Sequence, residues 1–105
     1  MTRGDVYRVR LPKQRGREQH GPRFAVVVQA DALLGLSTVL VAPTSRSVRP
    51  ASFRPEVVVG GESTRVLVEQ LRALDIGRLE DFADRLGPDE MRDVDEALSL
   101  VLALN

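Results

Sequence analysis

The 105-residue sequence contains no cysteine and no tryptophan, and its aromatic side chains are one tyrosine and three phenylalanines. Without cysteine the chain has neither disulfides nor thiolate metal sites, so packing alone has to hold it together. With so few rings, the core has to be aliphatic, built from valine, leucine, isoleucine and alanine. A chain of this length cannot build two independent cores, and we expect residues 1–105 to form a single domain.

Long apolar runs and metal-ligand clusters are also missing. No apolar run approaches membrane-spanning length, and the first ten residues are charged rather than apolar, unlike a secretory signal. The sequence therefore predicts a cytoplasmic protein without membrane contact. With one histidine, no cysteine and no carboxylate cluster in its basic segments, the chain is expected to hold no metal and no cofactor.

The formal net charge is zero, but the charges are unevenly distributed. Residues 1–60 carry 10 basic and 4 acidic side chains, whereas residues 61–105 carry 5 basic and 11 acidic ones. This separation predicts one cationic surface for a polyanion and an acidic surface kept apart from it. The alternative, that opposite charges simply pair within the fold, stays open.

The first half of the sequence predicts three strands separated by polar loops. Alternating residues predict a half-buried strand over 5–11, and a continuous apolar run predicts a central strand over 24–29. The segment 13–22 between them is polar and contains two glycines, which is typical of a surface loop. A third strand is expected over 38–42, with Pro43 ending it.

The second half predicts two further strands and one helix. A loop is expected over 44–55, followed by strands over 56–59 and 65–71 that are joined by a turn at 60–62. The segment 75–87 is ambiguous between a turn, a strand and a short helix.

The C-terminal segment has the pattern of an amphipathic helix. Gly87 and Pro88 followed by two acids favour a helix start, and apolar residues then recur at helical spacing: Met91, Val94, Leu98, Val101 and Leu102. The fold class expected is mainly β, a small curled antiparallel sheet closed by a C-terminal α-helix.

Six short segments, in this order and spacing, resemble the MazF/PemK growth-inhibitor toxins. They are RGDVY at 3–7, GREQHGPR at 16–23, AVVVQ at 25–29, VAPTS at 41–45, VEQLR at 68–72 and VDEAL at 94–98. The likeness spans nearly the whole chain. It implies a small SH3-like barrel of the plasmid-maintenance-toxin type. It also implies a homodimeric toxin of a type II toxin-antitoxin system that cleaves RNA at a short sequence and arrests growth until its antitoxin binds.

The resemblance also implies site residues. Arg23 and Thr44 fall on the family's catalytic arginine and its threonine partner, and Glu69 and Arg17 fall on positions where some branches have a contributing acid and histidine. Phe24 departs from the proline that usually follows the arginine.

These residue types suit metal-independent cleavage of RNA, because the substrate supplies its own nucleophile, the 2′-hydroxyl. Arg23 would stabilise the crowded phosphate, Thr44 would offer a hydroxyl, and Glu69 would serve as base or acid. The products would be a 2′,3′-cyclic phosphate and a 5′-hydroxyl. The alternatives are a surface arginine in an ion pair, a threonine that caps a turn and a solvated glutamate.

Further polar residues are candidates for binding single-stranded RNA, by base edges or by phosphates. His20 is also a candidate proton carrier. The predicted RNA-binding set is Arg17, Glu18, Gln19, His20, Gln29, Ser45, Arg46 and Gln70, with Arg49 and Arg54 as further phosphate contacts. An acidic, flexible antitoxin tail is expected to occupy the same basic groove.

Two other functions fit the same fold. One is a gyrase-poisoning toxin, a branch that resembles chains with a tryptophan-containing tail, whereas this chain ends in Leu104 and Asn105 and has no tryptophan. The other is a non-catalytic SH3-like module in which Arg23 and Thr44 only hold phosphate.

Overall fold

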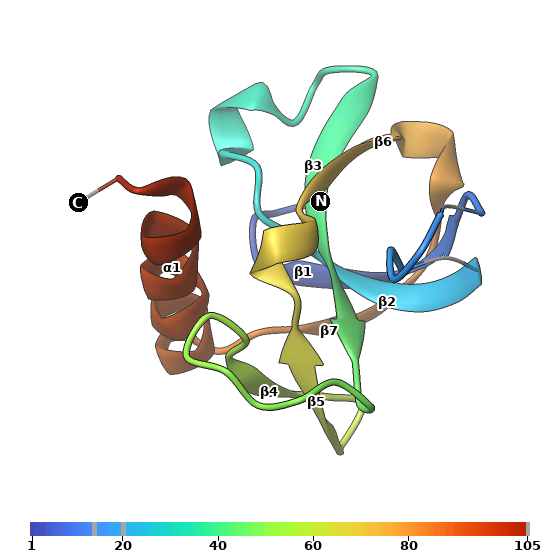
Figure 1. The fold of residues 1–105 in the computed structure, drawn as a ribbon. Helices are drawn as coiled ribbons and strands as arrows, with labels where there is room; N and C mark the ends of the chain where they lie inside the picture. The colour runs from blue at the N-terminus through green and yellow to red at the C-terminus, as the bar shows by residue number, and fades with distance from the viewer. Residues whose placement is uncertain (14, 20, 105) are drawn as a thin grey trace.

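The computed structural model describes residues 1–13, 15–19 and 21–104. This part of the chain contains, in order, β1 (Asp5–Leu11), β2 (Gly21–Val27), β3 (Thr38–Ser45), β4 (Glu56–Val59), β5 (Glu62–Val66), β6 (Arg72–Asp75), β7 (Leu79–Arg85) and α1 (Pro88–Leu102). Short 3-10 helices lie at η1 (Asp31–Leu33), η2 (Val68–Gln70) and η3 (Ile76–Arg78). The predicted class, mainly β with a C-terminal helix, is confirmed (Figure 1). No helix of the described residues is long and apolar enough to cross a membrane.

The strands form one curled antiparallel sheet. Its order is β4-β5-β3-β2-β1-β7, and β6 pairs with the first half of β3. Residues 38–41 of β3 pair with β6, whereas Thr44 and Ser45 pair with β5. Because β3 changes partner along its length, it joins the body of the sheet to the β4–β5 hairpin.

The second half of the central strand β2, residues 25–27, is buried on both faces, which explains its continuous apolar run. Successive side chains of a strand point to opposite faces. Ala25 and Val27 belong to one core cluster, with Val9, Leu11, Val39, Val41 and Leu74. Val26 and Val28 belong to the other, which includes residues of β4, β5 and α1. A strand with a core on each side needs apolar residues at every position.

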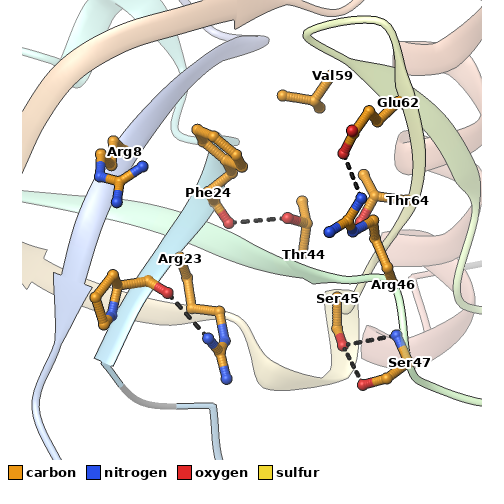
Figure 2. A pocket seen from close by; sticks show the side chains of 11 residues that line it. Arg8, Arg23, Phe24, Thr44, Ser45, Arg46, Ser47, Val59, Glu62 and Thr64 are labelled. Atoms are coloured by element: carbon orange, nitrogen blue, oxygen red, sulfur yellow. Dashed lines mark hydrogen bonds and ion pairs between the residues drawn. The ribbon is translucent and has the colours of Figure 1, made fainter.

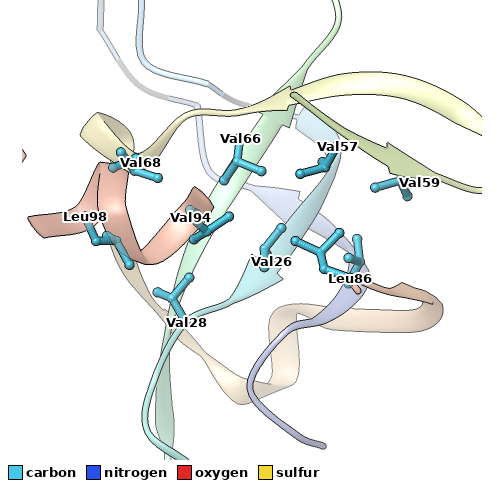
Figure 3. Packing of buried hydrophobic residues seen from close by; sticks show 12 residues of the cluster. Val26, Val28, Val57, Val59, Val66, Val68, Leu86, Val94 and Leu98 are labelled. Carbon is cyan, nitrogen blue, oxygen red and sulfur yellow. The ribbon is translucent and has the colours of Figure 1, made fainter. Parts of the chain in front are cut away.

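Helix α1 covers the second of these clusters. Val94, Ala97 and Leu98 are its buried residues, and they recur at the spacing of one helix face. Figure 3 shows Val94 and Leu98 beside Val26, Val28, Val66 and Val68. The predicted apolar face is confirmed in its centre. Val101 and Leu102, also predicted to belong to it, are exposed.

The bounds of β2 and β3 differ from those predicted. β2 begins at Gly21 rather than at 24, because Gly21 and Pro22 pair with Leu11 and Arg10 of β1, and it ends at Val27. Pro43 does not end β3, which continues to Ser45. Proline is excluded from a central strand where its missing N–H is needed. Here its carbonyl accepts a hydrogen bond from the N–H of Leu67, at 2.8 Å. Thr44 is therefore a strand residue, and not part of a 44–55 loop.

The predicted strand over 65–71 is wrong in both bounds. β5 starts at Glu62, directly after a two-residue turn in which Gly60 and Gly61 have φ angles of 60° and 82°. Such turns match the twist of the paired strands and require positive φ. The strand then ends at Val66, and residues 68–70 form η2. The sequence did not predict β6, and the ambiguous segment 75–87 contains η3 and β7. With these two additions the described strands number seven instead of about five.

We predict that Glu90 is the main polar anchor of α1. Its two carboxylate oxygens accept hydrogen bonds from the backbone N–H groups of Gly87, at 2.9 Å, and of Val58 in β4, at 2.8 Å. Glu90→Ala should lower the free energy of unfolding by about 1–2 kcal/mol, because two N–H groups lose their acceptor. Urea denaturation measures this. The matched control is Glu96→Ala, an exposed position of the same helix, which should change the value by less than about 0.5 kcal/mol. Equal effects of the two substitutions would contradict the assignment.

Candidate active site

A pocket of about 420 Å³ opens where β1 and β2 face the β4–β5 hairpin. Three arginines and one glutamate line it, so its charge is cationic. The lining residues are Arg8, Pro22, Arg23, Phe24, Thr44, Ser45, Arg46, Ser47, Val59, Glu62 and Thr64 (Figure 2). Arg23, Thr44, Ser45 and Arg46, four residues of the predicted site, therefore share one hollow.

Thr44 forms a fixed part of this lining. It is buried, and its Oγ1 donates a hydrogen bond to the carbonyl oxygen of Phe24 across the β2–β3 pair, at 3.1 Å. A hydroxyl has one proton and two lone pairs. In this arrangement Thr44 can accept a hydrogen bond, and donating to a bound phosphate requires it to turn away from Phe24.

Arg23 is exposed and lies on the part of β2 that projects beyond the core. Its Nε donates to Oε1 of Gln19, at 2.7 Å, and one terminal nitrogen donates to the carbonyl of Pro22, at 2.9 Å. A guanidinium has five N–H donors, so several remain for a ligand. None of the ion pairs formed by the described residues involves Arg23. Neutral acceptors therefore orient the Arg23 side chain, and no carboxylate among the described residues neutralises its charge.

Gln70 anchors the loop that holds Arg23. Its Oε1 accepts from the backbone N–H of Gln19, at 2.8 Å, and its Nε2 donates to the carbonyl of Arg17, at 3.3 Å. Arg72 donates to the carbonyl of Gln19, at 3.3 Å. The backbone of Gln19 is thus held on both sides, and its side chain in turn directs Arg23. Gln70 does not line the pocket. It supports the site indirectly, by holding the Gln19 backbone.

The other wall of the pocket is polar and adaptable. Arg46 pairs with Glu62 across the mouth, and Ser45 lies within 3.3 Å of the hydroxyl of Ser47. Both partners of the Arg46–Glu62 pair are exposed. An exposed ion pair contributes little net energy, so a phosphate can replace Glu62 as the partner of Arg46 at small cost.

Gln29 and Glu69, two further residues of the predicted site, also lie outside the pocket. Gln29 follows the end of β2 and is buried, with Nε2 donating to the carbonyl of Leu33 and Oε1 accepting from the N–H of Leu40. Both polar atoms of its amide are thus engaged within the fold, and Gln29 does not line the pocket. Glu69 lies on η2 instead of a strand and pairs with Arg54 at 2.7 Å. Its carboxylate lies outside the pocket, and this geometry does not support a role in proton transfer there.

Arg17 and Glu18 are exposed on the loop of residues 15–19. This loop contacts the pocket through the hydrogen bond between Gln19 and Arg23. His20 lies outside the described residues. Sequence reasoning missed Arg8, Glu62 and Thr64 as lining residues. Arg8 could have been found from the β1–β2 register, since it pairs with Phe24. The other two come from a hairpin whose position over the pocket no local pattern indicates.

A carboxylate outside the pocket fixes that hairpin. Oδ2 of Asp84 in β7 accepts from the N–H of Gly60, at 2.8 Å. Hydrogen bonds from the N–H groups of Gly60 and Arg85 hold the pKa of Asp84 below its usual range. The anchor is present near neutral pH and is lost only as the pH falls through that lowered pKa. Next to it, a hydrogen bond to the buried Asp5 raises the pKa of the Arg85 guanidinium.

Residues 2–102 match the model of a family described as PemK-like, MazF-like toxin of type II toxin-antitoxin system. The chain belongs to this toxin family. A Mycobacterium tuberculosis protein named as a toxin candidate is 44% identical to this MazF-like chain over 106 residues, which cover 99% of each.

Solved structures agree with the fold of this MazF-like chain. MazF from Deinococcus radiodurans is 25% identical, with a TM-score of 0.85 over 98% of this chain and 96% of that one. A mycobacterial endoribonuclease, solved in complex with its cognate antitoxin, is 21% identical, with a TM-score of 0.78 over 100% and 97%. The likeness confirms the predicted β-barrel architecture of the plasmid-maintenance toxins.

We predict that Gln70→Ala loosens the loop of residues 15–19 in this MazF-like chain, because the loop backbone loses two hydrogen bonds to the Gln70 amide. Limited proteolysis with trypsin should then cut after Arg15 and Arg17 several-fold faster than in the unmodified chain. Cleavage after Arg46, which is exposed in a different loop and is followed by Ser47, serves as the internal control and should keep its rate. A uniform increase at all three sites would mean general destabilisation and would contradict a local anchoring role.

Proposed function

We propose that this toxin, acting as a single domain over residues 1–105, is a metal-independent endoribonuclease. It cuts single-stranded RNA at a short sequence in the cytoplasm and thereby arrests growth. The observation that supports this best is that Arg23 and Thr44, from different strands, line one cationic pocket. A planar fork of donors with unused N–H groups suits phosphate oxygens. The similarity in fold to a mycobacterial endoribonuclease is compatible with this activity.

In the proposed reaction the 2′-oxygen attacks the adjacent phosphorus and loses its proton. The bond from phosphorus to the 5′-oxygen breaks, and that oxygen takes up a proton. The products are a 2′,3′-cyclic phosphate and a 5′-hydroxyl end. Arg23 binds the phosphate oxygens, on which negative charge accumulates in the transition state. Thr44 contributes its hydroxyl from the pocket wall, and Ser45 and Arg46 hold the neighbouring backbone.

The remaining candidates divide by position. Arg17, Glu18 and Gln19, on the loop beside Arg23, are proposed to contact RNA next to the scissile phosphate. Gln70 acts through Gln19. Gln29 and Glu69 are left out of the proposed site, because both are engaged elsewhere. His20 keeps its predicted role as an RNA-binding residue.

The activity is tested by incubating the purified protein with cellular RNA in EDTA. New ends with 5′-hydroxyl groups are expected, because no step uses a metal. Arg23→Ala should slow cleavage by at least about 100-fold, as loss of a transition-state donor does. Arg23→Lys should recover only part of the rate, since it keeps the charge but loses the fork. Arg92→Ala, on the exposed side of α1, is the matched control and should cut normally.

Two results would contradict the proposal. RNA that is bound but never cut would favour a binding module, and indifference to RNA would favour a toxin that acts on a protein such as gyrase. Full cleavage by a folded Arg23→Ala variant would show that the pocket is not the active site, although the protein would still be a nuclease.

We also propose that the toxin is a homodimer and that a cognate antitoxin neutralises it with an acidic, flexible segment laid over the pocket. Exposed apolar side chains at the end of α1, Leu100, Leu102 and Leu104, are available for an interface between copies. Mass spectrometry under native conditions should give twice the 11.6 kDa chain mass. Hydrogen exchange with antitoxin bound should show protection of residues 21–24 and 44–47. A monomer, or an unprotected pocket in the complex, would contradict the respective part.

A further inference from the structure

Among the four aromatic rings, Phe24 stands apart by its surroundings. Tyr7 and Phe82 pack edge to face, with ring centres 5.8 Å apart. Phe53 packs against a core cluster, and the guanidinium carbon of Arg54 lies 5.3 Å from the centre of its ring. Phe24 is 37% exposed and lines the pocket. Single exposed apolar side chains are common on proteins, so its exposure alone means little. Its place in a cationic pocket is the informative feature.

Phe24 is adjacent, along its own strand and across to neighbouring strands, to the groups proposed to bind phosphate. Phe24 directly follows Arg23, and its carbonyl accepts the hydrogen bond of Thr44. Across the β1–β2 pair it is opposite Arg8. Figure 2 shows the ring in the middle of the lining, with Arg8 on one side and Val59, Glu62 and Arg46 on the other. Arg23 and Phe24 are consecutive strand residues whose side chains point apart in Figure 2, but both line the same hollow. A nucleotide that spans this hollow can therefore contact Arg23 with its phosphate and the flat ring of Phe24 with its base.

We propose that Phe24 is the stacking platform for one nucleobase of the bound RNA, next to the phosphate held by Arg23. This inference rests on the proposed function and names a residue that contributes to substrate choice. Proteins read single-stranded RNA by stacking unpaired bases on aromatic side chains. Every base has a π-face, so the ring accepts all four, and preference follows stacking strength. The larger purines stack better than pyrimidines, and Phe24 therefore favours a purine at this position.

The lack of tryptophan makes a direct test feasible, because Phe24→Trp introduces the only tryptophan into the chain. The probe is a 12-nucleotide 2′-O-methyl RNA of random sequence, which cannot be cut because it lacks the attacking hydroxyl. Stacking should quench the tryptophan fluorescence in a saturable manner. Phe82→Trp is the matched control: it places the same fluorophore on an exposed position that lies outside the pocket, and it should show no such quenching.

A second measurement compares Phe24→Leu with Phe24→Tyr. Leucine keeps an apolar side chain but has no ring, and it should weaken binding of a labelled probe by about 5- to 150-fold, the range found for loss of one stacked base. Tyrosine should retain the affinity. The unmodified protein should bind 2′-O-methyl oligo(A) more tightly than oligo(U), and this difference should shrink in Phe24→Leu. Circular dichroism of each variant monitors folding.

The outcomes separate this inference from the proposed nuclease activity. If the unmodified protein cuts RNA, while Phe24→Trp is not quenched and Phe24→Leu binds normally, the stacking role is wrong and the nuclease assignment stands. If Phe24→Trp is quenched and Phe24→Leu binds weakly, but no RNA is ever cut, the stacking role stands and the nuclease assignment fails. If the probe does not bind at all, the stacking role is wrong, and the nuclease assignment also fails if no RNA is cut.

Discussion

The structure depends on the burial of one strand, β2, on both of its faces. Ala25 and Val27 point into one core and Val26 into the other, so the second half of β2 cannot shift in register without exposing apolar groups on both sides. The first half of the same strand is exposed and projects beyond the core. Arg23 and Phe24 lie on this projecting part, two residues and one residue before the first buried position, Ala25. A rigid core thus positions two exposed side chains in the lining of the pocket.

Charge pairing explains how a chain of zero net charge keeps a cationic pocket. Five of the six ion pairs among the described residues join the basic residues 1–60 to residues 61–105 or the reverse; the exception is Arg92–Asp89. The two predictions from the sequence, a separate cationic surface and pairing within the fold, are therefore both partly right. Most of the ion pairs run between the halves. Arg23 is held by amide and carbonyl oxygens, which orient it without neutralising it.

The sequence predicted those parts of the fold that local patterns determine. The limits of β1, β4 and α1 follow from alternation, turn glycines and a helix start, and all three are found where expected. Pro43 misled the prediction because a proline normally ends a strand. The strand continues because Thr44 and Ser45 pair with the distant strand β5, beside the bond from Leu67 N–H to the Pro43 carbonyl. Glu69 and Gln29 misled it for a related reason, since their partners Arg54, Leu33 and Leu40 are found only in the folded chain. Likewise, the family resemblance predicted that Arg23 and Thr44 share a site, whereas the hydrogen bond between Arg23 and Gln19 could be found only from the structure.

The central claim is that the ribose of the substrate supplies the nucleophile at a phosphate held in the Arg23–Thr44 pocket. The most direct measurement uses an RNA oligonucleotide containing a mapped cleavage site and a matched copy with a single 2′-deoxyribose on the 5′ side of the scissile phosphate. The copy should bind as tightly as the parent and remain uncut at that bond. Cleavage of the two oligonucleotides at equal rates would contradict the account.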